Sequence, residues 1–281
     1  MADTKRLPSA LAAWWTLEKA AIRTQGQYRG NLFAGFLGGL VYQGIQLIFV
    51  ALLLNSFGMI GGWNFKEIGL LLGVRPCAHS IYVIPFGALL RTSSLIHNGE
   101  FDLILLRPVN HFVQIFTRQF NIMSLGDGIL GLVSVTTFGA LAPVDWSWEN
   151  IGYLILAVIG GGLAETAIQI AIVSFSFTAT VVNSLQFMAD TIVTNFGVYP
   201  LAIFGKEGLL ALCFAFPLGF IAYLPTAALL GRVAEVPLPE WMVWTSPLAG
   251  WLLLPPHYGC STACHSTTPA PGHSITQRKT G

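Results

Sequence analysis

The chain has 281 residues, of which 54% are hydrophobic and only 10% are charged, and its mean hydropathy is +0.66. A water-soluble domain carries about 25% charged residues to keep its surface solvated, so this composition excludes a soluble fold and indicates a protein that lies in lipid. The formal net charge of +1 at pH 7 offers no basic surface for nucleic acid.

Residues 1–30 are rich in basic side chains and are expected to form a cytoplasmic N-terminus. Within them, residues 9–25 hold the pair Trp14 and Trp15, apolar residues at helical spacing and two basic residues, Lys19 and Arg23. Tryptophans beside basic side chains are typical of a helix that lies in the membrane interface rather than crossing it. The sequence predicts such an interfacial amphipathic helix, with a loop or a short soluble helix as the alternative.

Residues 31–254 are expected to form the transmembrane domain, because apolar runs of the roughly 20 residues needed to cross a bilayer follow one another along them. A further run at 209–230 is interrupted by two prolines, and the last apolar stretch, 247–254, is too short to cross. We therefore expect an all-α, polytopic helical bundle of about six spans. The other five runs are 32–54, 68–90, which is weakened by Arg75, Pro76 and His79, 122–141, 151–175 and 181–204.

The distribution of basic residues predicts the orientation of these spans. Cytoplasmic loops of membrane proteins carry an excess of lysine and arginine. The loops after the first and third spans contain one basic residue between them, Lys66, whereas the loop after the second span contains Arg91, Arg107 and Arg118. We expect a multi-pass protein of the cell (inner, cytoplasmic) membrane with its N-terminus in the cytoplasm.

The cytoplasmic loop 96–110 has the pattern of a short amphipathic helix. Gly99 can end the preceding helix, and Pro108 ends whatever begins after it. Acidic residues near the start and Arg107 at the end suit the helix macrodipole. Such a helix, with Phe101, Ile104 and Leu105 on one face, can dock into a groove of a partner protein. An ordinary loop between two spans is the alternative.

Three segments of the chain then follow one another in a recognisable order. The first is 99–110, Gly-Glu-Phe-Asp-Leu-Ile-Leu-Leu-Arg-Pro-Val-Asn. The second combines 198–204, Val-Tyr-Pro-Leu-Ala-Ile-Phe, with 216–225, Phe-Pro-Leu-Gly-Phe-Ile-Ala-Tyr-Leu-Pro, and the third is 246–248, Ser-Pro-Leu. Over about residues 10–254 the chain resembles permeases of the type-2 (exporter) family of ABC transporters, in particular a branch of short bacterial permeases.

The resemblance implies a permease of about six spans that forms a translocation path with a second permease subunit, identical or similar. It also implies a separate cytoplasmic ABC ATPase that binds the loop 96–110 and carries the ATP and Mg²⁺. The chain itself contains no G-x-x-x-x-G-K-[ST] phosphate loop, so we expect neither a catalytic site nor a cofactor on it. The loop residues expected at the ATPase are Gly99, Glu100, Phe101, Asp102, Leu105, Leu106, Arg107 and Pro108.

Members of this family also place broken, partly re-entrant helices on the outer side before the last span. The resemblance assigns that structure here to Tyr199, Pro200, Pro217 and Pro225. Non-helical backbone survives at membrane depth only where protein or water satisfies its polar groups.

Three acidic residues inside the predicted spans, Asp127, Glu165 and Asp190, are candidates for the translocation path. Each charge at a helix centre costs about 2.5–3.5 kcal/mol on insertion scales, so such residues are functional candidates by default. Arg75 and His79 are candidate counter-groups. Two alternatives remain: structural hydrogen bonds between helices, or a proton relay that would make the chain an ion- or proton-coupled secondary transporter acting without an ATPase.

Residues 255–281 form a polar tail rich in proline, serine and threonine, which we expect to be disordered or to come from a shifted reading frame. The family's last span would continue apolar where Pro255 and Pro256 stand. The tail contains metal-binding residue types, but their spacing fits no zinc or haem pattern and predicts no metal site. These residues are His257, Cys260, Cys264, His265 and His273.

Overall fold

The structure is a computed structural model that describes residue 19, residues 29–91, residue 121 and residues 124–174 and 182–254. All regular secondary structure in these ranges is helical, apart from one isolated β-bridge between Ile60 and Trp63. The expected all-α class is confirmed. The predicted interfacial helix, the loop 96–110 and the tail 255–281 lie outside the described residues.

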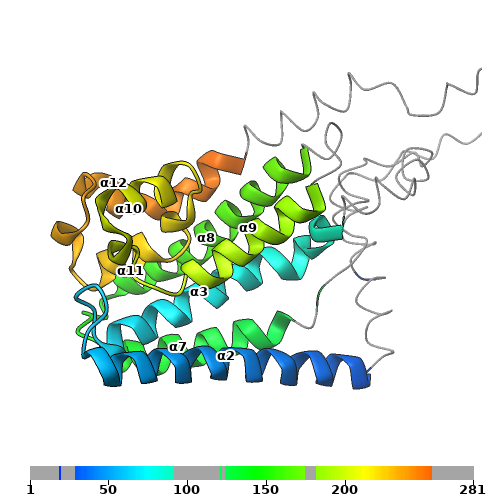
Figure 1. The fold of residues 1–281 in the computed structure, drawn as a ribbon, viewed down its shortest axis with the longest axis horizontal. Coiled ribbons are helices and arrows are strands. Elements are labelled where there is room, and N and C mark those ends of the chain that lie inside the picture. The colour runs from blue at the N-terminus through cyan, green and yellow to red at the C-terminus, as the bar shows by residue number, and fades with distance from the viewer. Residues whose placement is uncertain (1–18, 20–28, 92–120, 122–123, 175–181, 255–281) are drawn as a thin grey trace, which may run out of the picture.

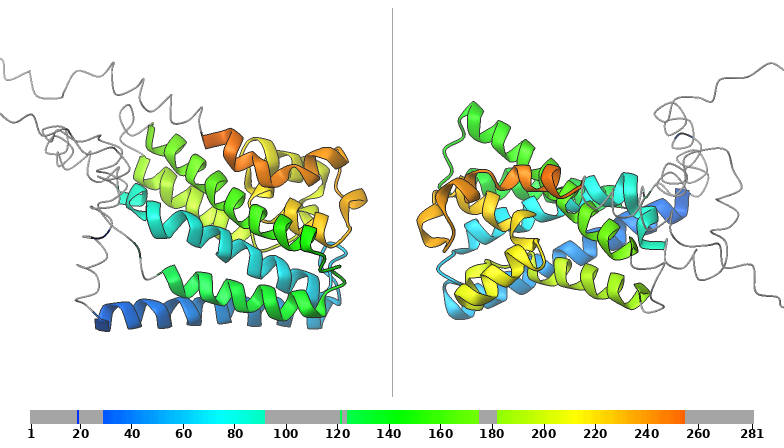
Figure 2. Two further views of the ribbon diagram at one scale, coloured as in Figure 1. Left: turned by 180° about the vertical axis from the view of Figure 1, so that it is seen from behind. Right: turned by 90° about the horizontal axis from the view of Figure 1, so that it is seen from above.

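Five long helices form the bundle, and Figures 1 and 2 show them lying side by side along its length. Helix α3 is central and packs on both α7 and α8, while α2 lies at the edge against α7. In the most apolar stretch of α3, 72% of the residues are buried, against 17% in α2. The five helices are α2 (Arg29–Phe57), α3 (Phe65–Phe86), α7 (Leu125–Leu141), α8 (Trp148–Ser174) and α9 (Val182–Phe196).

The segment after α9 folds into short helices that gather at the end of the bundle where α2 ends and α3 begins (Figure 1). Its prolines limit the length of each piece, because proline lacks the backbone N–H that continues a helix. Another short helix, η1 (Gly87–Arg91), follows α3 at the opposite end. The short helices after α9 are η4 (Leu201–Phe204), α10 (Gly205–Phe214), η5 (Leu218–Phe220), α11 (Tyr223–Leu229), η6 (Val233–Glu235), α12 (Glu240–Trp244) and η7 (Ser246–Leu248).

Three helices in the described residues are long and apolar enough to cross a membrane: Phe33–Phe57, Phe65–Leu89 and Trp148–Val173. They coincide with three of the expected spans. The run 122–141 forms the shorter apolar helix Leu125–Leu141. The described part of the chain therefore contains three such helices, or up to four if a bent pair is counted as one span.

That bent pair shows that the apolar run 181–204 is not one continuous helix. The helix ends at Phe196, and the pair Ser184–Phe196 and Leu201–Phe214 turns by 110° at the break. Pro200 begins η4 with extended backbone, and Gly205 at its end has φ +69°, a conformation that favours glycine. The sequence 209–230 likewise forms three short helices rather than one span, so the count of about six stays a prediction.

Close helix approach holds α3 in the centre of the bundle. Gly162 on α8 faces α3 so closely that a Cβ added there would lie 2.7 Å from the carbonyl oxygen of Ala78. Gly73 on α3 and Gly131 on α7 play the same part at the other interface, because each faces backbone atoms of the opposite helix. Small residues let helix backbones approach in this way inside membranes. Two side-chain clusters on α3 depend on this packing.

Candidate functional site

Halfway along the bundle, α3, α8 and α9 bring five polar side chains together in its interior. Arg75 and His79 lie one turn apart on α3, and Glu165 and Gln169 lie one turn apart on α8. Asp190 comes from α9 and interacts electrostatically with Arg75, His79 and Glu165. We call Arg75, His79, Glu165, Gln169 and Asp190 the mid-helix cluster.

Glu165 is the centre of this cluster, and none of its surface is exposed. The Nδ1 atom of His79 lies 2.7 Å from its Oε1 atom, so a proton on Nδ1 is donated to the carboxylate. The Nη2 atom of Arg75 lies 3.9 Å from the same oxygen and donates a hydrogen bond of 3.0 Å to Thr194 Oγ1 on α9. Through Arg75 and Glu165, the cluster therefore connects all three helices.

The pairing in the cluster is incomplete. Among the described residues, Glu165 Oε2, Asp190 Oδ1 and both side-chain polar atoms of Gln169 are buried without a hydrogen-bond partner. The Nε atom of Arg75 and the hydroxyl of the neighbouring Tyr82 are likewise buried without a hydrogen-bond partner. A buried polar group without a partner costs about 1–3 kcal/mol, and the great majority of such groups in folded proteins are paired. These unpaired groups make the mid-helix cluster the first candidate for a functional site in the described residues.

Asp127 does not contact the mid-helix cluster, although the sequence grouped it with Glu165 and Asp190. It lies in the first turn of α7, and its Oδ1 atom would be 3.0 Å from a Cβ added at Gly39 of α2. Its carboxylate is within electrostatic range of Arg75 and His79 but has no ion pair with either in the described structure. Asp127 is therefore placed between α2 and α7, beside the cluster rather than in it.

Sequence reasoning missed Gln169, Tyr82 and Thr194. Gln169 could have been found, because it follows Glu165 by four residues and therefore shares its helix face. Thr194 gives no such signal, since only the packing of α9 on α3 brings its hydroxyl to Arg75. The residues named for a broken helix lie at helix ends or in short helices: Tyr199 and Pro200 between α9 and η4, Pro217 before η5, and Pro225 in α11.

A second ionic cluster lies where α3 begins, and we call Glu67, Arg232 and Glu235 the end cluster. Arg232 lies 3.0 Å from a Glu67 carboxylate oxygen and 2.8 Å from a Glu235 oxygen. Glu67 also accepts a hydrogen bond of 2.8 Å from the backbone N–H of Asn64, whose side chain caps α3 in return. Partial burial lowers the pKa of a guanidinium, but the hydrogen bonds from Arg232 to Glu235 and Glu67 outweigh this effect and raise its pKa.

Neither cluster is arranged as a metal centre in the described residues. Across the described residues, no group of three or more His, Cys, Asp or Glu side chains is placed to hold a metal ion. The loop residues Gly99 to Pro108, expected to contact an ATPase, lie outside those residues.

Comparison with known proteins gives one result for this chain. Residues 40–255 match a family model described as ABC-2 family transporter protein. The match spans the described helices from α2 to η7 and the intervening loop 96–110. Neither a curated protein nor a solved structure gives a significant match.

Proposed function

The chain belongs to the ABC-2 family of transporter proteins, and from this membership we propose that it is the permease subunit of an ATP-driven exporter. The match over residues 40–255 carries the proposal, because it includes both the helical bundle and the loop 96–110. In this proposal a separate cytoplasmic ATPase binds ATP and Mg²⁺, and the chain itself carries out no chemical step. Two permease subunits, identical or similar, form the translocation path between them in the cell membrane.

The position of the loop in the sequence supports a mechanical role. Residues 92–120 lie in the chain between η1, which follows α3, and α7, so a force on the loop acts on α3 and α7. Arg75 and His79 on α3 hold Glu165 of α8, and Arg75 also holds Thr194 of α9. We propose that movement of the docked loop reaches α8 and α9 through these contacts.

The geometry supports different roles for the three acidic residues expected along the translocation path. Asp127 and Asp190 are partly exposed, which suits groups that meet a polar cargo or water. Glu165 is fully buried between two basic side chains, which suits a residue that positions α3 against α8. Lining the path is thus proposed for Asp127 and Asp190, and positioning for Glu165.

The test of the proposed function is the variant Asp102→Ala with Arg107→Ala, purified from cells that also express a candidate partner ABC ATPase. We expect membrane insertion to be unchanged and co-purification of the ATPase to be lost, because the docking helix loses Arg107 at its end and one of the two acidic residues at its start. The matched control is Lys206→Ala with Glu207→Ala, which removes one basic and one acidic exposed residue from α10 at the opposite end of the bundle. Unchanged co-purification in the Asp102/Arg107 variant would contradict the assignment.

One observation favours a second candidate function. In the mid-helix cluster, the Nδ1 atom of His79 lies 2.7 Å from Glu165 Oε1, and Asp190 interacts electrostatically with both residues. Neighbouring titratable side chains of this kind are what a secondary transporter driven by a pH gradient requires. Transport by vesicles that persists without ATP, follows an imposed pH gradient and is lost in Asp190→Asn would establish this candidate and exclude the ATP-driven permease.

A further inference from the structure

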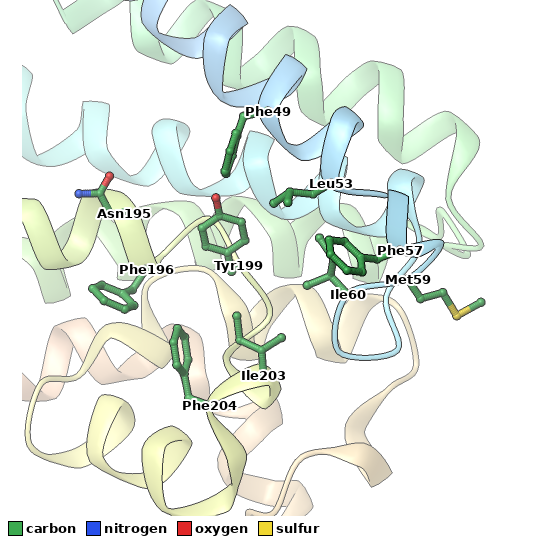
Figure 3. Close-up of a pocket in the computed structure, with 10 residues that line it drawn as sticks. All are labelled: Phe49, Leu53, Phe57, Met59, Ile60, Asn195, Phe196, Tyr199, Ile203 and Phe204. Atoms are coloured by element: carbon green, nitrogen blue, oxygen red, sulfur yellow. The ribbon is translucent and has the colours of Figure 1, made fainter. Parts of the chain in front are cut away.

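An apolar pocket opens at the end of the bundle where α2 finishes (Figure 3). Its walls are the last turns of α2, the turn after it, the end of α9 and η4, and its volume is about 650 Å³. This volume is within the range of about 300–1,000 Å³ that is usual for small-molecule sites. The lining residues are Phe49, Leu53, Phe57, Met59, Ile60, Asn195, Phe196, Tyr199, Ile203 and Phe204.

Aromatic rings supply half of this lining, and none of the ten lining side chains is charged. The rings of Phe196 and Phe204 pack with centroids 5.3 Å apart and an interplanar angle of 53°. A charged group placed among these rings would have no counter-charge and would lose its hydration, which is costly. The part of a ligand that enters the pocket must therefore be apolar and uncharged.

Two hydrogen-bonding groups interrupt the apolar wall. Figure 3 shows Tyr199 with its hydroxyl directed toward Phe49, and Asn195 on α9 at one side of the pocket. In the part of the chain that the structure describes, neither side chain has an intramolecular hydrogen-bond partner. A neutral hydroxyl, ether or amide on the ligand can form a hydrogen bond with either side chain without bringing in a charge.

The pocket also spans the break between α9 and η4. Asn195 and Phe196 belong to the last turn of α9, while Ile203 and Phe204 belong to η4 beyond the 110° turn. A ligand that touches both sides of this break has an affinity that depends on the angle between them. Conversely, a change of that angle would bind or release the ligand.

From these observations we propose that the pocket is a cargo subsite for the apolar part of an uncharged amphipathic molecule, whose polar group binds Asn195 and Tyr199. That the ligand is a transported cargo rests on the proposed function, whereas the binding site itself does not depend on that function. Aliphatic lining would suffice for a resident lipid chain, whereas the aromatic rings and the two free polar groups suit a molecule with a defined polar head.

The test uses the full-length chain in phosphatidylcholine nanodiscs with a diazirine-bearing long-chain alcohol as the photoreactive probe. We expect mass spectrometry to find the label at residues 49–60 and 195–204, and excess unlabelled dodecanol to compete with it. Leu53→Trp narrows the pocket at its α2 wall and should lower labelling by about tenfold, since the bulkier ring obstructs the alkyl chain. Asn195→Leu keeps the volume but removes one hydrogen bond, and should lower labelling by about threefold.

The matched control is Ile45→Trp, on the exposed face of α2 one turn before Phe49 and outside the pocket lining. It should label as strongly as the unmodified chain. Label spread evenly along α2, or equal loss in the control, would overturn the subsite. A diazirine-bearing phosphatidylcholine that labels the same residues and is not displaced by dodecanol would identify a resident lipid and overturn the assignment to cargo.

A final arm separates this inference from the proposed function. With the partner ATPase bound, addition of ATP should reduce the labelling of residues 195–204, because transport releases the cargo. If labelling depends on Leu53 but does not change with ATP, and the ATPase does not co-purify, the ATP-driven function is contradicted and the binding site is supported. If the ATPase co-purifies and no label is found in the pocket, the binding site is contradicted and the ATP-driven function is supported.

Discussion

Two ionic clusters on α3 differ in how completely their charges are paired. In the end cluster, Arg232 binds both Glu67 and Glu235, and Glu67 also closes the cap of α3. In the mid-helix cluster, Glu165 and Asp190 each keep one buried oxygen without a partner among the described residues. The end cluster connects η6 to the start of α3, while the mid-helix cluster connects three long helices.

Position along the helix explains why this difference matters. The side chain of Glu235 is 55% exposed, so water can complete whatever the protein leaves unpaired at that end. The side chain of Glu165 is 0% exposed, so bulk water does not reach its unpaired oxygen. A buried polar group without a partner costs about 1–3 kcal/mol, so full pairing, as in the end cluster, is what suits a cluster that only holds helices together. The incomplete cluster is therefore the better candidate for movement or transfer during a transport cycle.

The largest expected effect comes from removing the arginine of the mid-helix cluster. Arg75→Met leaves Glu165 and Asp190 without their main counter-charge inside the bundle, and breaking a buried ion pair in this way costs about 3–5 kcal/mol. SDS-induced unfolding of the purified chain in detergent would measure this loss. The double variant Arg75→Met with Glu165→Gln should recover part of it, because the two residues interact directly. Additive losses would show that the pair is not coupled.

A smaller effect is expected from the packing that brings α3 to α8. A Cβ at Gly162 would meet the carbonyl oxygen of Ala78 at 2.7 Å and the Cβ of Ile81 at 2.6 Å, so Gly162→Ala must push α3 away from α8. Overpacking of this kind costs about 1–3 kcal/mol, and it should also lengthen the His79–Glu165 contact. Gly152→Ala on the same helix is the control, since nothing lies within 4 Å of a Cβ there. Equal stability of the two variants would contradict this account.

The sequence predicts the residues of the mid-helix cluster better than those of the end cluster. Charged residues inside apolar runs are rare and expensive, so Glu165, Asp190, Arg75 and His79 stand out without any structure. The structure then pairs Glu165 with both basic residues. Glu67 lies in a loop by hydropathy alone, and Arg232 is 165 residues away, so no local pattern predicts that they meet.

The bend at 197–200 shows a different limit of the sequence. Tyr199 and Pro200 are visible as a helix-breaking motif, yet the apolar run continues past them to Phe204. Hydropathy reports how apolar a segment is and not its direction, so by hydropathy the run 181–204 counts as one span, whereas the structure turns by 110° within it. The same limit hides the pocket, because its lining comes from α2, α9 and η4, which only the fold brings together.

Removal of the arginine of the end cluster should cost less than the same change in the mid-helix cluster. Arg232→Met keeps the alkyl stem but removes the hydrogen bonds to Glu67 and Glu235, and we expect a loss of about 1–2 kcal/mol. The guanidinium also lies 5.8 Å from the ring centroid of Trp63, a cation–π contact that methionine does not replace. Both variants are to be measured by SDS unfolding under identical conditions. If Arg232→Met loses as much unfolding free energy as Arg75→Met, the two clusters do not differ in the way proposed.

The smallest effect is expected from Glu235→Gln in the end cluster. Its side chain is 55% exposed and its bond to Arg232 is a local contact between residues i and i+3, so water and the remaining amide oxygen replace most of what is lost. Arg232 would still bind the buried Glu67, which carries the connection to α3. We expect SDS unfolding to shift by less than about 0.5 kcal/mol. Glu67→Gln is the comparison, because it removes a buried partner of Arg232 and weakens the cap of α3, and it should be the more damaging of the two. If the exposed glutamate proved the more costly to replace, the buried contact would not be what anchors η6 to the start of α3.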